Sequence, residues 1–194
     1  MTSKKPRIHT IISLTTLLIL LFLLSPYAEA QIEPATDREY LLLATTRTGT
    51  MEKELNEAAS RGFRVITSAP SSGKEVIIFL EKSTKETQQY NYRLLATTRT
   101  STMQKELDEG AAIGFRFLSR TPICKGSTFG ADEIVLVMEQ ADGDAEPRYE
   151  YKLLATTRTA TLQREVATEV NNGFSIAAIV SCTEHIVIME REIT

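Results

Sequence analysis

Apolar and polar stretches follow one another in the same order three times along this chain of 194 residues. Each round opens with a stretch rich in Leu, Thr and Tyr, followed by an amphipathic stretch, a Gly-Phe pair and two further apolar stretches. The opening stretch contains the letters LLATTRT in every round, at residues 42–48, 94–100 and 153–159. Recurrence at this spacing is typical of small structural modules in tandem.

The opening stretch of each round predicts a β-strand, because it contains neither Gly nor Pro and favours residues common in strands. The amphipathic stretch predicts a helix of about three turns, because apolar residues recur at i, i+4, i+7 and i+8. These positions hold Met51, Leu55, Ala58 and Ala59, then Met103, Leu107, Gly110 and Ala111, then Leu162, Val166 and Val170, where Glu169 interrupts the stripe.

Two sets of residues compete for the start of each helix. Ser101 with Gln104 fits a capping box, and the corresponding pairs are Gly49 with Glu52 and Ala160 with Gln163. Thr48, Thr100 and Thr159, one residue earlier, are the competing caps. The end of each helix is predicted at Gly62, Gly114 and Gly173, since Gly adopts the left-handed conformation without a steric clash.

Two more strands follow each helix and form a hairpin. The second strands are predicted at 63–68, 115–120 and 174–180, and the third at 75–81, 133–139 and 184–190. Turns are predicted between them at 70–74, 121–132 and 181–184, where Gly, Pro, Ser, Cys and Thr accumulate. Each round is therefore predicted to be a β-α-β-β unit.

The sequence predicts an α+β fold of three tandem β-α-β-β repeats, each a ferredoxin-like half. A right-handed crossover makes the first and second strands parallel with a gap between them. The third strand is the most apolar and is expected to fill that gap, which gives the order 1-3-2 with the helix on one face. Tyr40, Leu42 and Ala44 are assigned to the helix face. Leu43 and its counterparts Leu95 and Leu154 then lie on an uncovered face, so the repeats are expected to pack into a shared core.

The predicted boundaries follow from this pattern. Repeats are predicted at 40–82, 92–140 and 151–194, with linkers at 83–91 and 141–150 and a polar leader at 31–39. Residues 1–30 read as a signal peptide, because KKPR precedes an apolar run and SPYAEA ends in an A-x-A pattern at Ala30. We expect export to the periplasm or outside the cell after cleavage near Ala30; an uncleaved membrane anchor is the alternative.

One known family has the same inner order. A strand that opens like YEYK at 149–152, a helix that ends in Gly and an aromatic residue, and a hairpin that ends in VLVMEQ resemble the β-α-β-β domain of unknown function 4177. The resemblance spans almost all of each repeat. It implies a small ferredoxin-like half-fold and no assigned activity, so it supplies no catalytic residues.

The composition argues against several classes of function. The net charge is −3, and residues 1–30 carry +2, so the remainder is near −5 and has no basic character for nucleic acid. His185 is the one histidine after the signal, at a strand position that Val76 and Ile134 hold in the other repeats. No metal-ligand spacing, phosphate loop or nucleophile motif is present. The sequence predicts no enzyme and no cofactor.

The two cysteines, Cys124 and Cys182, fall in connections between second and third strands of different repeats. In an oxidising compartment they are a disulfide candidate. A bridge requires Cα atoms about 4.4–6.8 Å apart. Two separate free thiols are the other interpretation.

The TTRT segment is the one candidate site. Arg at the start of a helix, beside hydroxyl groups, suits a carboxylate, phosphate or sulfate. The candidates are Arg47, Arg99, Arg158, Thr48, Thr100 and Thr159. The favoured alternative is structural: each Arg pairs across strands with Glu75, Glu133 or Glu184. Glu54, Glu106 and Glu165 on the helices are a second set of partners.

Two functional classes remain. The first is a non-catalytic exported interaction or structural module, which binds another exported protein or itself. The second is a small-anion binding protein that uses the TTRT arginines. A membrane contact is expected only through the signal segment.

Overall fold

The computed structural model describes residues 38–71, 74–83, 88–127, 130–143 and 148–193. The predicted signal peptide and most of the leader lie outside the described residues. The chain divides into two compact units, 1–37 and 38–194, and the fold below is that of the second. Within the described ranges, none of the helices combines the length and apolar character that a membrane crossing needs.

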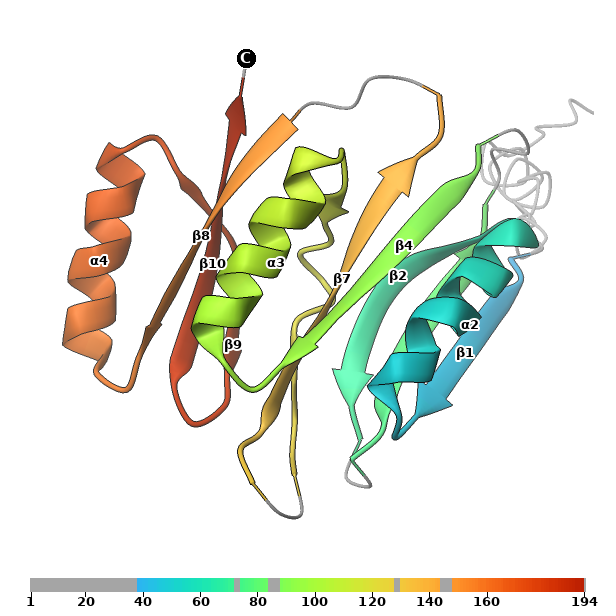
Figure 1. The fold of residues 1–194 in the computed structure, drawn as a ribbon, viewed down its shortest axis with the longest axis horizontal. Helices are drawn as coiled ribbons and strands as arrows, with labels where there is room; N and C mark the ends of the chain where they lie inside the picture. The colour runs from blue at the N-terminus through green and yellow to red at the C-terminus, as the bar shows by residue number, and fades with distance from the viewer. Residues whose placement is uncertain (1–37, 72–73, 84–87, 128–129, 144–147, 194) are drawn as a thin grey trace, which may run out of the picture. The chain divides into compact units, whose positions relative to one another are not determined.

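The described residues form three helices and three antiparallel sheets, which confirms the α+β class (Figure 1). The strands of each sheet are given below in their spatial order, and the helix named with each sheet follows its first strand in the chain. The first sheet contains β1 (Tyr40–Thr45), β3 (Val76–Lys82) and β2 (Phe63–Pro70), with α2 (Thr48–Ser60). The second contains β4 (Tyr90–Thr97), β7 (Glu133–Ala141) and β5 (Arg116–Phe117), with β6 (Ile123–Lys125) also on β7 and with α3 (Thr100–Ala112). The third contains β8 (Arg148–Thr156), β10 (His185–Ile193) and β9 (Ser175–Ser181), with α4 (Thr159–Asn171).

The predicted capping boxes are wrong. Each helix begins at the Thr of TTRT, and the residue before it, Arg47, Arg99 or Arg158, is an extended N-cap without a side-chain capping bond. Glu52 and Gln104 do not turn back to their own helix starts; they bond to the next sheet. The helix ends follow the prediction, because Gly62, Gly114 and Gly173 have φ near +90° just after the last turn: 85°, 91° and 88°.

The second strand of the second sheet differs from the prediction of a strand at 115–120 and a turn at 121–132. The strand β5 stops at Phe117, and β6 lies inside the predicted turn. The buried Thr121 explains the break: its hydroxyl accepts a hydrogen bond from the N–H of Val137 at 3.0 Å and donates to the carbonyl of Leu118 at 2.7 Å. The Thr121 side chain thus accepts the hydrogen bond of the Val137 N–H, which a carbonyl of a neighbouring strand would otherwise accept.

The assignment of the two faces of the first strand is also wrong. Leu41 and Leu43 pack with the core beneath α2, whereas Tyr40, Leu42 and Ala44 are exposed on the other face. Strand alternation separates two faces but does not say which one the helix covers. The register decides it, because Leu43 lies opposite the fully buried Ile78.

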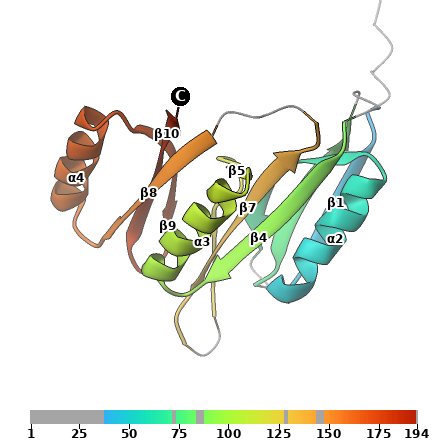
Figure 2. The same ribbon diagram turned by 45° about the horizontal axis from the view of Figure 1, so that its top comes forward.

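Two of the three core clusters extend from one sheet to the next. The first joins α2 and the first sheet to Tyr92, Val135 and Val137 on the helix-free face of the second sheet. The second joins α3 and the second sheet to the third sheet through Tyr151 and Ile188. Figures 1 and 2 show α3 between β4 and β8. The core is therefore shared between neighbours, and the third sheet with α4 has a small cluster of its own.

Two strands begin inside the segments predicted as linkers. The strand β4 starts at Tyr90 and β8 at Arg148. Both extensions carry a Tyr ring, Tyr90 or Tyr149, on which an Arg of the preceding sheet stacks. This cation–π contact stabilises the added strand residues, because the attraction between the guanidinium and the ring requires the ring to be held in place.

Candidate functional site

The TTRT arginines lie at three separate helix starts. In each, the backbone N–H of the Arg donates to the side-chain hydroxyl of the Thr two residues earlier, at 3.0–3.2 Å. The first turn of each helix contains no acidic residue. In the described part of the chain, no salt bridge reaches Arg47, Arg99 or Arg158. The structure does not bring the three sites together.

The predicted pairs of these arginines with strand glutamates are wrong. Thr45 lies opposite Val76, and one further step of this register puts Thr46, not Arg47, opposite Glu75. Because side chains alternate between faces, Arg47 and Glu75 then point to different sides of the sheet. The same offset separates Arg99 from Glu133, which pairs with Lys125 at 3.1 Å instead.

The helix glutamates do not pair with the TTRT arginines either. None of the salt bridges among the described residues involves Glu54, Glu106 or Glu165. One oxygen of Glu106 is buried, and the described protein atoms offer it no hydrogen-bond partner. The charges of TTRT therefore have no structural role in the described contacts.

A cluster that the sequence did not predict joins the first and second sheets. Arg64 of β2 makes a salt bridge to the buried Glu139 of β7, with Nη2 2.7 Å from Oε1. Tyr92 donates its hydroxyl to Glu139 at 2.8 Å and accepts the N–H of Val65 at 3.0 Å. The hydrogen bond to Glu139 raises the pKa of Arg64, and burial raises the pKa of Tyr92. The cluster fixes the two sheets against each other.

The second and third sheets are joined by the same kind of cluster. Arg116 of β5 lies 3.6 Å from a carboxylate oxygen of Glu190 in β10 and stacks over Tyr149. Tyr151 accepts the N–H of Phe117 at 2.9 Å, and burial raises the pKa of Tyr151 to about 12. Arg64, Arg116, Glu139 and Glu190 line one hollow. Its acids are paired with arginines, so its geometry fits a structural joint better than an acid–base site.

A signal for these clusters was present in the sequence. Arg follows the Gly-Phe pair in two of the three rounds, and Glu ends the third strand in each. The sequence pattern alone does not show that the Arg of one round meets the Glu of the next. That pairing depends on how the sheets stack.

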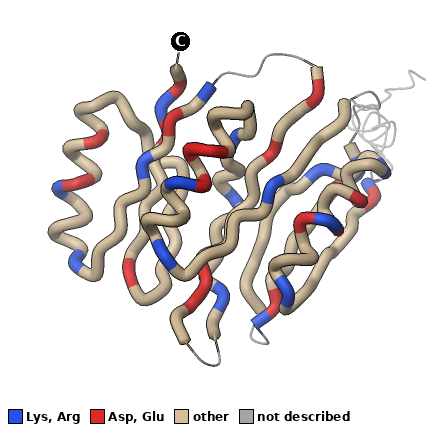
Figure 3. Tube along the Cα trace, in the orientation of Figure 1, with Lys and Arg blue, Asp and Glu red and all other residues tan. Residues whose placement is uncertain are grey.

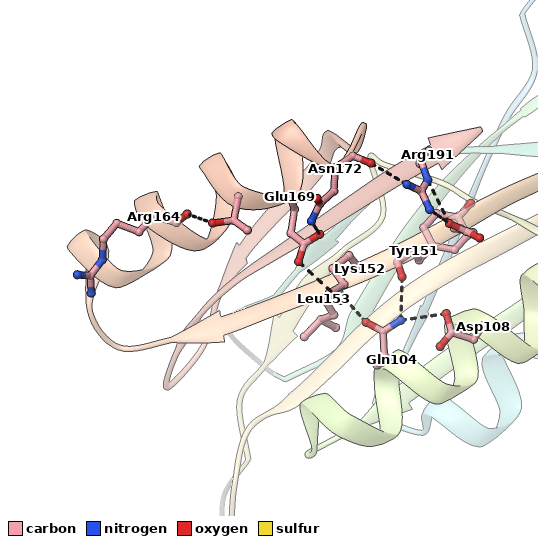
Figure 4. A network of polar contacts seen from close by, with 11 residues as sticks. Gln104, Asp108, Tyr151, Lys152, Leu153, Arg164, Glu169, Asn172 and Arg191 are labelled. Carbon is pink, nitrogen blue, oxygen red and sulfur yellow. Dashed lines mark hydrogen bonds and ion pairs between the residues drawn. The ribbon is translucent and has the colours of Figure 1, made fainter. Parts of the chain in front are cut away.

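Polar side chains of each helix also bind the edge of the next sheet. Gln104 of α3 donates to the carbonyl of Tyr151 at 3.0 Å and accepts the N–H of Leu153 at 2.7 Å (Figure 4). Between α2 and the second sheet, Asn56 donates to the carbonyl of Tyr92 at 2.9 Å and Glu52 accepts the N–H of Leu94 at 2.9 Å. These bonds satisfy backbone groups on the outer edges of β4 and β8.

Among the described residues, α4 carries no such bond to a further sheet. Figure 4 shows polar contacts of α4 and its C-cap returning to the third sheet: Lys152 with Glu169, and Arg191 with the carbonyl of Asn172. These contacts hold α4 on its own strands.

The two cysteines are brought together. Cys124 of β6 forms a disulfide with Cys182, just after β9, and their Cα atoms are 5.4 Å apart. This distance lies within the range that a bridge requires. Of the two interpretations of the sequence, the structure contains the bridge, and it ties the second sheet to the third.

The remaining chemical groups are sparse. His185 begins β10, and its Nδ1 lies 3.1 Å from the hydroxyl of Ser181 across the hairpin. No group of His, Cys, Asp and Glu suited to a metal ion occurs within the described ranges. Figure 3 shows Lys and Arg interspersed with Asp and Glu along the described chain.

An apolar face is left open on the first sheet. We call it the first-sheet face; it consists of Tyr40, Leu42, Ile77 and Phe79 on the side of β1 and β3 opposite α2. Tyr40 is 55% exposed, whereas Tyr92 and Tyr151 at the corresponding positions are 3% and 4% exposed. The difference arises because α2 and α3 cover the second and third sheets.

These features define an α+β protein whose sheets are joined by ion pairs and a disulfide, and whose first sheet leaves an apolar face uncovered. Comparison with known protein families, curated proteins and solved structures found no match. The geometry alone therefore supports the functional argument.

Proposed function

We propose that this protein is a non-catalytic, exported interaction or structural module built from three repeats of one β-α-β-β element. The observation that carries the proposal is the first-sheet face, where Tyr40, Leu42 and Phe79 are exposed together. Contiguous apolar surface on a folded chain marks a contact site for another protein. The resemblance to the domain of unknown function 4177 fits this proposal, since it brings no activity with it.

Export is part of the proposal. The disulfide between Cys124 and Cys182 supports it, because such bridges persist in oxidising compartments. N-terminal sequencing of the protein recovered from outside the cytoplasm is the direct check. A new terminus at Gln31 is the expected result, and a terminus at Met1 would contradict cleavage.

The experiment for the contact face uses a photoreactive phenylalanine analogue in place of Phe79. Phe79 is exposed, so the substitution leaves the core intact. We expect illumination of producing cells to link position 79 to a protein, and Leu42→Asp to abolish the product. The same analogue at the exposed Ile113, outside this face, is the control. Equal products at both positions, or none at position 79, would contradict the proposal.

Small-anion binding is the second candidate. It is supported by three helix starts that lack a side-chain cap while an unpaired Arg stands at each N-cap position of the described chain. Free N–H groups and a cation favour an anion there. Phosphate, sulfate and citrate would raise the melting temperature through linkage. The rise should fall in Arg99→Ala and persist in the control Lys105→Ala; no rise, or an equal rise in both variants, would exclude this candidate.

A further inference from the structure

The contact between neighbouring sheets is built twice inside the chain with the same groups. A polar side chain of the helix binds the edge strand of the next sheet, at Leu94 and at Leu153. A backbone N–H of the second strand, Val65 or Phe117, donates to a Tyr hydroxyl of the next sheet. We call the contributing side, helix plus second strand, the donor side. The receiving side is the helix-free face and outer edge of the next sheet.

Each half of this contact occurs once more without a partner among the described residues. The first-sheet face is a receiving side that no helix covers. The third helix and β9 form a donor side: Ile176 is 57% exposed, whereas Val65 and Phe117 at the corresponding positions are 7% and 2% exposed. Val170 of α4 and Ile179 of β9 are exposed as well. The two open surfaces are therefore the two halves of one contact.

The polar groups of the contact are kept at both open surfaces. Gln163 of α4 is exposed at the position of Gln104, which binds both the carbonyl and the N–H of its edge strand. Tyr40 of β1 stands at the position of Tyr151, whose carbonyl and hydroxyl take part in the internal contact. The outer edge of β1 thus offers to Gln163 the groups that β8 offers to Gln104.

The ion pair of the internal contacts is missing at the open surfaces. Ser175 stands where Arg64 and Arg116 make their salt bridges. Glu81, at the position of Glu139, has Oε1 3.4 Å from Nη1 of Arg38, which lies just before β1. At this position, therefore, neither open surface carries an unpaired charge that would repel the other. A contact between them is apolar with a few hydrogen bonds and depends little on salt.

We propose that the partner of the first-sheet face is a second copy of this chain, whose α4 and β9 dock on it head to tail. This inference rests on the proposed interaction function and names its partner. The argument for a second copy is continuity, since the docking would extend an interface that the chain already uses twice. The two surfaces differ, so the contact is heterologous and produces a chain of copies or a ring.

Sedimentation of the full chain tests the proposal between about 1 µM and about 1 mM, the range of weak protein contacts. We expect the average mass to rise with concentration, with little change on adding salt. Leu42→Asp places a charge in the receiving side, and Ile176→Asp places one in the donor side. Each variant alone should remain a single chain. Ile113→Asp, an exposed apolar position outside both surfaces, is the matched control and should associate normally.

The mixture of the two variants gives the decisive result. Leu42→Asp keeps an intact donor side, and Ile176→Asp keeps an intact receiving side. Mixed together they should form a one-to-one dimer and nothing larger. Gln163→Ala should weaken association by roughly tenfold, as two hydrogen bonds are lost. Circular dichroism melting confirms that each variant is folded.

Three outcomes would overturn the inference. The wild-type chain could remain single over the whole range. Both Asp variants could associate normally, or their mixture could fail to form a dimer. If the chain stays single while position 79 still crosslinks to a different protein, the inference fails and the proposed function stands. If both experiments fail, both are wrong.

Discussion

At the scale of single residues, the groups that hold the protein together are Tyr, Arg and Glu side chains between sheets. Tyr92 and Tyr151 each insert a phenol beneath the preceding sheet and accept a backbone N–H there. A buried phenol must form its hydrogen bond inside the protein, because water does not reach it. The hydroxyl therefore sets the distance between neighbouring sheets as well as filling space.

The first prediction concerns the buried phenol of Tyr151. Its pKa in the folded protein is about 12, whereas an exposed Tyr in the unfolded chain titrates near about 10. The folded-state pKa is raised, so the stabilising contribution is complete below a pH of about 10 and is lost as the pH rises toward about 12. We expect the free energy of unfolding to fall by up to about 1.4 kcal/mol per pH unit in that window.

Urea unfolding at several alkaline pH values measures this loss. Other groups titrate in the same window, so the comparison is with Tyr151→Phe, whose stability should fall less steeply with pH. Tyr40→Phe removes an exposed phenol and serves as the control. Equal slopes for wild type and Tyr151→Phe would show that the phenol does not carry the effect.

At the scale of elements, the three helices differ in how much of their surface is buried. The helix α2 buries Met51, Leu55, Ala58 and Ala59, because it lies against its own sheet and the next one. The helix α3 places Gly110 where α2 has Ala58. The reason is the sheet beneath it: Met138 stands at the position of Leu80, and its thioether fills the space that a Cβ would need.

The second prediction is that Gly110→Ala destabilises the protein. A Cβ at this position would lie 2.5 Å from the sulfur of Met138, so this fully buried side chain would have to shift within the core. Overpacking costs about 1–3 kcal/mol, which outweighs the gain of about 1 kcal/mol from replacing a helical Gly. We expect a net loss of up to about 2 kcal/mol in chemical unfolding.

Gly49→Ala is the matched control in α2. A Cβ there meets nothing within 4 Å, so only the helix propensity changes and stability should stay level or rise by up to about 1 kcal/mol. If both variants gain stability, Met138 adapts to the added methyl group and the packing argument is wrong.

At the scale of the whole molecule, the sheets are held together by contacts between neighbours. The first and second sheets share one core cluster, and the second and third share another. The disulfide of Cys124 and Cys182 adds a covalent link to the second of these contacts. An arrangement held by nearest-neighbour contacts is less well supported at its ends.

The third prediction is that α4 opens more readily than α2. Leu162 is the buried residue of α4, and the cluster around it is the smallest of the three. Local opening requires little free energy where few apolar contacts are broken. In dilute solution, hydrogen exchange followed by mass spectrometry should show faster exchange in α4 than in α2, despite their equal length of 13 residues.

Concentration provides a check on this prediction. Head-to-tail docking would cover α4, so its exchange should slow at high protein concentration in the wild type. It should not slow in Ile176→Asp, whose donor side is disrupted. Equal protection of α2 and α4 in dilute solution would contradict the link between buried contacts and opening.

The sequence by itself determined the elements. Its apolar period of two or about 3.6 residues and the glycine after each helix placed the three helices, their ends and most of the strands, because these depend on local backbone preferences. The α+β class followed from their order.

Only the tertiary structure decided which strand face each helix covers, that Arg64 meets Glu139 and that Cys124 meets Cys182. These pairings join residues distant in the chain, and local sequence carries no record of how one sheet stacks on the next. The open first-sheet face emerged for the same reason: Tyr40 and Tyr92 stand in similar sequence, and they differ because α2 covers one of them and not the other.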